Sequence, residues 1–118
     1  MTAPAQSTRL DSAGGEEVCP FFHEAVELLG KRWTGAIVQA LLVAPRRFSE
    51  ISPAVPQISD RLLSMRLREL EAEGIVDRQV LNGAPFRVEY ALTPKGRALE
   101  PAVCALGTWA REWLTRPS

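Results

Sequence analysis

The 118-residue chain has the composition of one folded domain, with 46% hydrophobic and 24% charged residues. No apolar run approaches the roughly 20 residues that span a bilayer, and no secretory signal is recognisable, so we expect a cytoplasmic protein without a membrane segment. The formal net charge is zero and the sequence pI is about 6.6, which argues against a positively coated protein that binds nucleic acid indiscriminately.

The amino-terminal part of the chain changes character near residue 18. Residues 1–17 are rich in small, polar and charged residues without apolar periodicity, which predicts a disordered tail ahead of a domain at 18–116. Pro20 at a first helical position predicts a helix that Gly30 ends. Residues 33–43 are apolar nearly all round, which is typical of a helix at the centre of a core.

Two helices joined by a tight turn are predicted next. Residues 49–55 form the first, which ends before Pro56, and residues 59–73 form the second, with Ser59 as its N-cap. Leu63, Leu67 and Leu70 recur at spacings of four and three, so they share one buried face. This arrangement is a helix-turn-helix, in which the second helix enters the major groove of DNA.

The opposite face of that second helix carries groups that suit base recognition. At about 100° per residue, two guanidinium groups, a hydroxyl and an apolar tip fall together there. Arginine forks can read guanine, and hydroxyl or apolar groups can meet other base edges. The predicted DNA-contacting residues of this recognition helix are Ser59, Arg61, Ser64, Met65 and Arg68.

A β-hairpin is predicted to follow directly. Gly74 ends the recognition helix, an extended run reaches Leu81, turn residues occupy 82–86, and residues 87–92 alternate as a second strand. The fold class is therefore mainly α with a small β-hairpin (α+β), a winged helix-turn-helix.

Five further arginines are candidates for contacts of the wing and flanks with the DNA backbone. Arg66 more plausibly pairs with Glu69 or Glu73, and strand arginines commonly pair with neighbouring carboxylates. For Arg87, beside the loop tip, we favour the DNA contact, whereas for Arg78 both alternatives stay open. The full set is Arg46, Arg47, Arg66, Arg78 and Arg87.

The carboxy-terminal part predicts a helix with an unusually apolar stripe. Thr93 as N-cap and Pro94 at the first position start a helix that runs to about Leu114, and Pro101 should kink or restart it. The stripe exceeds what a peripheral helix of so small a domain needs, although it could pack within one chain. With the first helix it predicts a homodimer interface made of Phe22, Val26, Leu99, Val103, Leu106, Trp109 and Trp113.

Several motifs in order resemble the HxlR-type winged helix-turn-helix transcriptional regulators of bacteria. They are Cys19-Pro20, Leu29-Gly30-Lys31-Arg32-Trp33-Thr34, Pro45-Arg46-Arg47-Phe48-Ser49-Glu50-Ile51, Ile58-Ser59, Leu63-Ser64, Arg66-Leu67-Arg68-Glu69-Leu70-Glu71, Arg87-Val88-Glu89-Tyr90 and Leu92-Thr93-Pro94-Lys95-Gly96. The resemblance implies a homodimer, joined through its terminal helices, that binds double-stranded DNA at a pseudo-palindromic operator. The alternative is a winged-helix module that binds protein and not DNA. Residues 30–33 read Gly-Lys-Arg-Trp, where many family members have Gly-Gly-Lys-Trp. The resemblance therefore does not indicate which inducer this protein would bind.

Two cysteines raise the question of redox chemistry. Cys19 begins the first helix, where aligned amides stabilise a thiolate, and the resemblance implies that a cysteine there can sense oxidants or electrophiles. A small-ligand effector is the other option. Cys104 falls in the predicted buried stripe of the last helix. Cys19 and His23 have no partners for catalysis or zinc binding, so we expect no enzyme activity, no cofactor and no metal.

Overall fold

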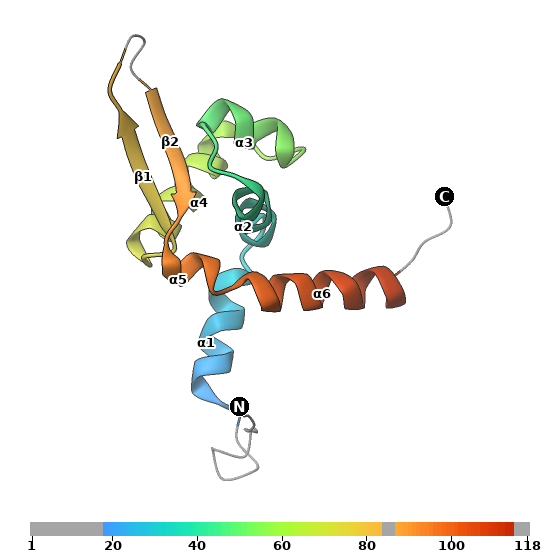
Figure 1. Ribbon diagram of the computed structural model, residues 1–118. Helices are drawn as coiled ribbons and strands as arrows, with labels where there is room; N and C mark the ends of the chain where they lie inside the picture. The colour runs from blue at the N-terminus through green and yellow to red at the C-terminus, as the bar shows by residue number, and fades with distance from the viewer. Residues whose placement is uncertain (1–17, 84–86, 115–118) are drawn as a thin grey trace. The chain divides into compact units, whose positions relative to one another are not determined.

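The computed structural model describes residues 18–83 and 87–114 (Figure 1). The predicted tail at residues 1–17 lies outside them. In chain order the elements are α1 (Pro20–Leu29), α2 (Thr34–Val43), α3 (Phe48–Ala54), α4 (Asp60–Ala72), β1 (Val76–Leu81), β2 (Arg87–Leu92), α5 (Pro94–Arg97) and α6 (Glu100–Trp113). The chain divides into two compact units, residues 1–32 with α1 and residues 33–118 with all other elements. A mainly helical fold with one antiparallel hairpin confirms the predicted fold class.

The helix of the first unit has the predicted ends. Cys19 is its N-cap in an extended conformation, and Pro20 occupies the first turn, where a missing N–H costs no hydrogen bond. Gly30 caps the other end by donating its N–H to the carbonyl oxygen of Val26 at 2.7 Å. None of the residues of α1 is buried.

The core of the second unit is centred on α2. Ile37, Val38 and Leu41 are fully buried, which confirms the prediction of a core helix. The helix begins one residue later than predicted, because Trp33 takes a left-handed conformation at φ 75° and acts as the N-cap. Side chains from α3 and α4 add to the core, with Ile51, Leu63, Leu67 and Leu70 at 1% exposure or less.

The two helices of the helix-turn-helix are α3 and α4. The first begins at Phe48, one residue before the predicted start, because the carboxylate of Glu50 accepts the Arg47 N–H at 2.8 Å and caps this end. A turn follows in which Gln57 has a positive φ of 73°. Ser59 is the N-cap of α4, and its hydroxyl oxygen accepts the Leu62 N–H at 3.1 Å, which confirms the predicted cap.

The hairpin forms the wing. β1 and β2 pair antiparallel, with Val76 opposite Leu92 and Leu81 opposite Arg87. The predicted turn includes residues 84–86, which lie outside the described residues. Arg46 adds one bridge to the outer side of β2, because its N–H donates to the Tyr90 carbonyl at 3.0 Å and its carbonyl accepts the Tyr90 N–H at 2.8 Å.

The carboxy-terminal helix is divided, and one prediction about it is wrong. Thr93 caps α5 as expected. The helix is interrupted by a turn at residues 98–99 and restarts as α6 with Pro101 in its first turn, which agrees with the predicted kink or restart at Pro101. Cys104 is exposed, not buried in the apolar stripe. Its helical position explains this, since four-residue steps place it in line with Glu100 and Thr108 on the polar side.

Candidate nucleic-acid interface

The recognition helix α4 separates into a buried face and an accessible face. Leu63, Leu67 and Leu70 point into the core. On the other side Arg61 and Arg68 are exposed, and neither forms a hydrogen bond or ion pair with another described residue. Beside them Met65 is 38% exposed and Ser64 is half-buried. The structure therefore brings the predicted base-reading groups together on one accessible surface, with two guanidinium forks unoccupied by described residues.

Arg61 and Arg68 are seven residues apart, which is close to two helical turns, so their guanidinium groups lie on the same side of α4. A separation of seven residues corresponds to about 10 Å along a helix axis. This is roughly three base-pair steps at about 3.4 Å each, so both side chains can meet one stretch of major groove. Ser59 lies at the start of the same helix, and its hydroxyl oxygen already accepts the Leu62 N–H.

Arg66 differs from its neighbours because it is held by an ion pair. Its Nη1 lies 3.1 Å from Glu69 Oε1 and 3.4 Å from Oε2, and its side chain is only 16% exposed. This is the pairing that the sequence favoured. The carboxylate competes with any phosphate for this guanidinium.

The arginines before α3 are also engaged. Arg46 is half-buried, and its Nε donates to the carbonyl oxygen of Ala40 at 2.9 Å. Arg47 lies 3.6 Å from the carboxylate of Glu50. The backbone N–H of Arg47 lowers the pKa of Glu50 below its usual value, and the charge of the Arg47 guanidinium acts in the same direction. Glu50 therefore stays ionised and compensates part of the positive charge at this corner.

The wing carries two accessible arginines. Arg78 stands opposite Tyr90 and Arg87 opposite Leu81, and both side chains are exposed. Neither is paired with Asp77 or Glu89 or with any other described residue. The alternative of cross-strand ion pairs is therefore not what the structure has, and both guanidinium groups face solvent.

A set of hydrogen bonds at the C-terminal end of α4, here called the joint, connects residues 73–75 to residues 93–96 and was not predicted from the sequence. The Thr93 hydroxyl donates to the Gly74 carbonyl at 2.6 Å and accepts the Gly96 N–H at 3.1 Å. Lys95 Nζ donates to the Glu73 carbonyl at 2.6 Å. These bonds satisfy carbonyl groups that a helix end leaves unpaired, and they fasten the recognition helix to the start of α5. The sequence signal for these bonds is the run Thr93-Pro94-Lys95-Gly96, from which only the N-cap and the family resemblance were inferred.

The two predicted dimer helices both expose apolar side chains. On α1, Phe22 is 61% and Val26 48% exposed. On α6, Leu106, Trp109 and Trp113 are 67%, 51% and 69% exposed, whereas Leu99 and Val103 are half-buried. Neither helix contains a buried residue.

Cys19 is half-exposed at the start of α1, and its side chain makes no capping hydrogen bond. Within residues 18–83 and 87–114, no group of three or more His, Cys, Asp and Glu side chains could hold a metal ion. The helices of the same residues are too short or too polar to cross a membrane.

Residues 28–118 match the family described as HxlR-like helix-turn-helix. The chain belongs to this family. The similar family members are transcriptional regulators. This confirms that the protein is a regulator and not an enzyme. One HxlR-like relative is YvaP of Bacillus subtilis, an uncharacterised HTH-type transcriptional regulator, 51% identical over 98 residues that cover 83% of this chain and 91% of YvaP. Another is the HTH-type transcriptional regulator YodB of Bacillus subtilis, 44% identical over 99 residues, or 84% of this chain and 88% of YodB.

Solved structures agree with this assignment. The reduced form of YodB from Bacillus subtilis is 42% identical, with a TM-score of 0.76, and the match covers 86% of this chain and all of that one. YodB has also been solved after diamide treatment, with a TM-score of 0.70, and bound to a quinone, with a TM-score of 0.71. The redox regulator HypR in its reduced form is 37% identical, with a TM-score of 0.73, over 77% of this chain and 90% of HypR.

Proposed function

We propose that this HxlR-like regulator binds DNA sequence-specifically, as a cytoplasmic homodimer on a pseudo-palindromic operator. The observation that carries the proposal is the accessible face of α4, where Arg61 and Arg68 have no partner among the described residues. A guanidinium fork donates to O6 and N7 of one guanine, a contact worth about 1 to 3 kcal/mol of discrimination against other bases. Ser64 and Met65 meet the bases between them.

The wing and flanks supply contacts to the DNA backbone in this proposal. Arg87 and Arg78 are available for a phosphate or for the minor groove, because no described residue occupies them. Arg46, Arg47 and Arg66 contribute less, since each already donates to or pairs with an acceptor of the protein.

An affinity measurement tests the DNA-binding proposal. Fluorescence anisotropy with the DNA upstream of the protein's own gene, at moderate salt, should give saturable binding that unrelated DNA competes poorly. Arg68→Ala should lower the ratio of operator to unrelated-DNA affinity about tenfold, because it removes a base contact. Arg97→Ala, an exposed arginine of α5, is the matched control and should keep the ratio.

Two outcomes would oppose this reading. A uniform loss of affinity in Arg68→Ala across all sequences would assign Arg68 to phosphate contact. Absence of operator binding by the folded protein would favour a winged-helix module that binds protein.

The dimer is proposed from the apolar surfaces of α1 and α6. Contiguous exposed aromatic and aliphatic side chains are characteristic of interfaces, and Trp109 and Trp113 are suitable anchors. Sedimentation at micromolar concentration should give a dimer, and the double variant Trp109→Glu/Trp113→Glu should give a folded monomer with weaker operator binding. A monomeric parent protein would contradict the proposal.

Cys19 is proposed as the group through which oxidants or electrophiles act. Support comes from its half-exposed thiol at the start of α1 and from the 42–44% identity to YodB, whose structures include diamide-treated and quinone-bound forms. A thiolate can add to a quinone ring carbon to form a carbon–sulfur bond. Quinone treatment should change the operator affinity of the reduced protein and of Cys104→Ser, but not of Cys19→Ser. An equal response in Cys19→Ser would refute this role.

A further inference from the structure

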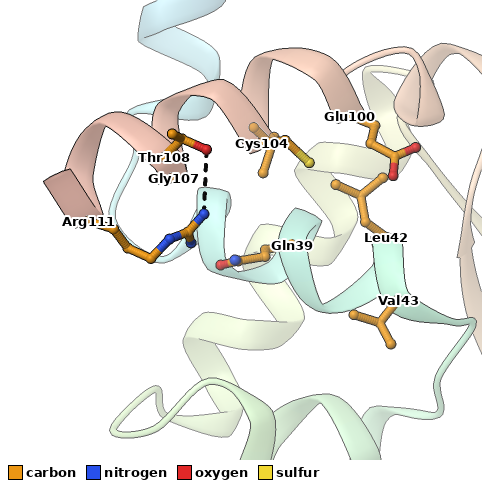
Figure 2. A pocket seen from close by; sticks show the side chains of 9 residues that line it. Gln39, Leu42, Val43, Glu100, Cys104, Gly107, Thr108 and Arg111 are labelled. Atoms are coloured by element: carbon orange, nitrogen blue, oxygen red, sulfur yellow. Dashed lines mark hydrogen bonds between the residues drawn. The ribbon is translucent and has the colours of Figure 1, made fainter.

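A groove runs between α2 and α6, within the second unit of the chain (Figure 2). Its volume is about 280 Å³, just below the range of about 300 to 1,000 Å³ that is typical of small-molecule sites. From α2 it is lined by Gln39, Leu42 and Val43, and Val43 is 74% exposed. This wall is mainly apolar.

The wall contributed by α6 explains why the groove exists. The residues that α6 contributes to the groove include the small ones Cys104, Gly107 and Thr108, beside the larger Glu100, Val103 and Arg111. A Cβ added at Gly107 would meet Arg111 Nη1 at 3.6 Å, an ordinary contact, so no clash requires glycine there. The small residues leave room between the helices.

The groove and the apolar stripe of α6 are different surfaces. At about 100° per residue, Leu106, Trp109 and Trp113 fall on another side of the helix from Cys104 and Thr108. The helix thus presents a mainly polar wall to α2, whereas its large apolar side chains Leu106, Trp109 and Trp113 lie on another side. A dimer formed through the stripe leaves the groove wall itself free, with Val103 at the shared edge.

One end of the groove is suited to an anion. Arg111 Nη2 donates to Thr108 Oγ1 at 3.4 Å, and Arg111 has no other partner among the described residues. Figure 2 shows Gln39 directing its amide toward this end. A planar guanidinium with unused N–H groups matches a carboxylate, which accepts two parallel hydrogen bonds.

The opposite end excludes a second negative group. Glu100 lines the groove eleven residues before Arg111, which corresponds to about 16 Å along the helix axis. Its carboxylate repels anions there. The groove therefore matches a molecule with one carboxylate and an apolar body that packs on Leu42 and Val43.

We propose that this groove is the effector site of the regulator and binds a small monocarboxylate with an apolar body. The inference deepens the proposed function by naming the class of effector. Within the second unit α6 packs on α2, and a ligand bound between these two helices is expected to change the position of α6. Because α6 carries the proposed dimer stripe, that change alters the spacing of the two recognition helices and hence operator affinity.

The test uses the full chain and three probes of similar size. Benzoate is the carboxylate probe, benzamide is neutral and benzylamine is cationic. In an NMR titration, benzoate should shift the backbone amide signals of Gly107 and Thr108 saturably, with affinity at least about tenfold higher than that of the other two. Arg111→Gln should weaken benzoate binding about tenfold or more, while Arg97→Gln should not change it.

Three results would overturn the proposal. They are the absence of saturable shifts at groove residues, equal binding of the three probes, and unchanged benzoate affinity in Arg111→Gln. Shifts of the same amides with protein concentration, without any benzoate effect, would instead place a second copy of the chain in the groove.

Unchanged operator affinity at saturating benzoate would remove the effector role. Since the NMR titration contains no DNA, a failure of DNA binding counts against the proposed function and leaves this binding test valid.

Discussion

Thr93→Val should destabilise the protein by removing a hydroxyl while keeping the shape of the side chain. In the native joint this hydroxyl donates to the Gly74 carbonyl at 2.6 Å and accepts the Gly96 N–H at 3.1 Å. Loss of an N-cap typically costs about 1 kcal/mol, and loss of a second hydrogen bond costs about 1 kcal/mol more. The expected total is about 2 kcal/mol, or a decrease of about 8 °C in Tm for a domain of this size.

Urea and thermal unfolding followed by circular dichroism would measure this change. Thr93→Ser keeps both hydrogen bonds and should remain within about 0.5 kcal/mol of the parent protein. Thr108→Val is the control for removal of a hydroxyl from an exposed helix position. It loses only the exposed 3.4 Å hydrogen bond from Arg111 Nη2, so its effect should be similarly small. Hydrogen exchange should show faster exchange at the Gly96 amide in Thr93→Val. Equal stability of the valine and serine variants would refute the role assigned to the hydroxyl.

Three further predictions concern backbone fit and charge. Gly96→Ala should destabilise by about 3 kcal/mol or more in urea unfolding, because the added Cβ would collide with the Ile75 carbonyl oxygen, and an unchanged midpoint would contradict the packing. Gln57→Gly should raise the free energy of unfolding by about 0.5 to 1 kcal/mol in the same assay, because glycine adopts the left-handed conformation without strain and this gain exceeds its entropy cost. A lower free energy of unfolding would show that the Gln57 side chain makes a stabilising contact. Glu50→Gln should lower stability above the unfolded-state pKa of about 4.3, and the difference from the parent should vanish as pH falls through the lowered pKa of Glu50; a pH-independent difference would refute the ionic contribution.

The sequence predicted those elements whose ends have their own chemical signals. Ser59 marked the start of the recognition helix because a hydroxyl before a leucine repeat caps free amides, and the structure has this bond. Gly74 marked its end because the chain there takes a left-handed conformation, at φ 76°. The leucine spacing then fixed which face is buried, and hence which arginines are accessible.

Other features were not predicted, for different reasons. The start of α3 shifted by one residue because Glu50 caps it from inside the helix, a local capping pattern that was not recognised. The joint at Thr93 and Lys95 depends on carbonyl groups about twenty residues earlier in the chain, which local patterns do not reveal. Cys104 was assigned to an apolar stripe by composition, although its angular position places it with polar neighbours.

Arg46 links two parts of the second unit, the wing and the core helix α2. Its backbone pairs with Tyr90 in the wing, and its side chain donates to the Ala40 carbonyl in the core helix α2. The wing is thereby braced against the body that also holds the recognition helix. In the proposed DNA complex, two contacting elements that are already fixed relative to each other would lose little conformational freedom on binding, so more of the contact energy would remain as affinity. Such bracing would allow a regulator with no net charge to bind DNA through a few arginines.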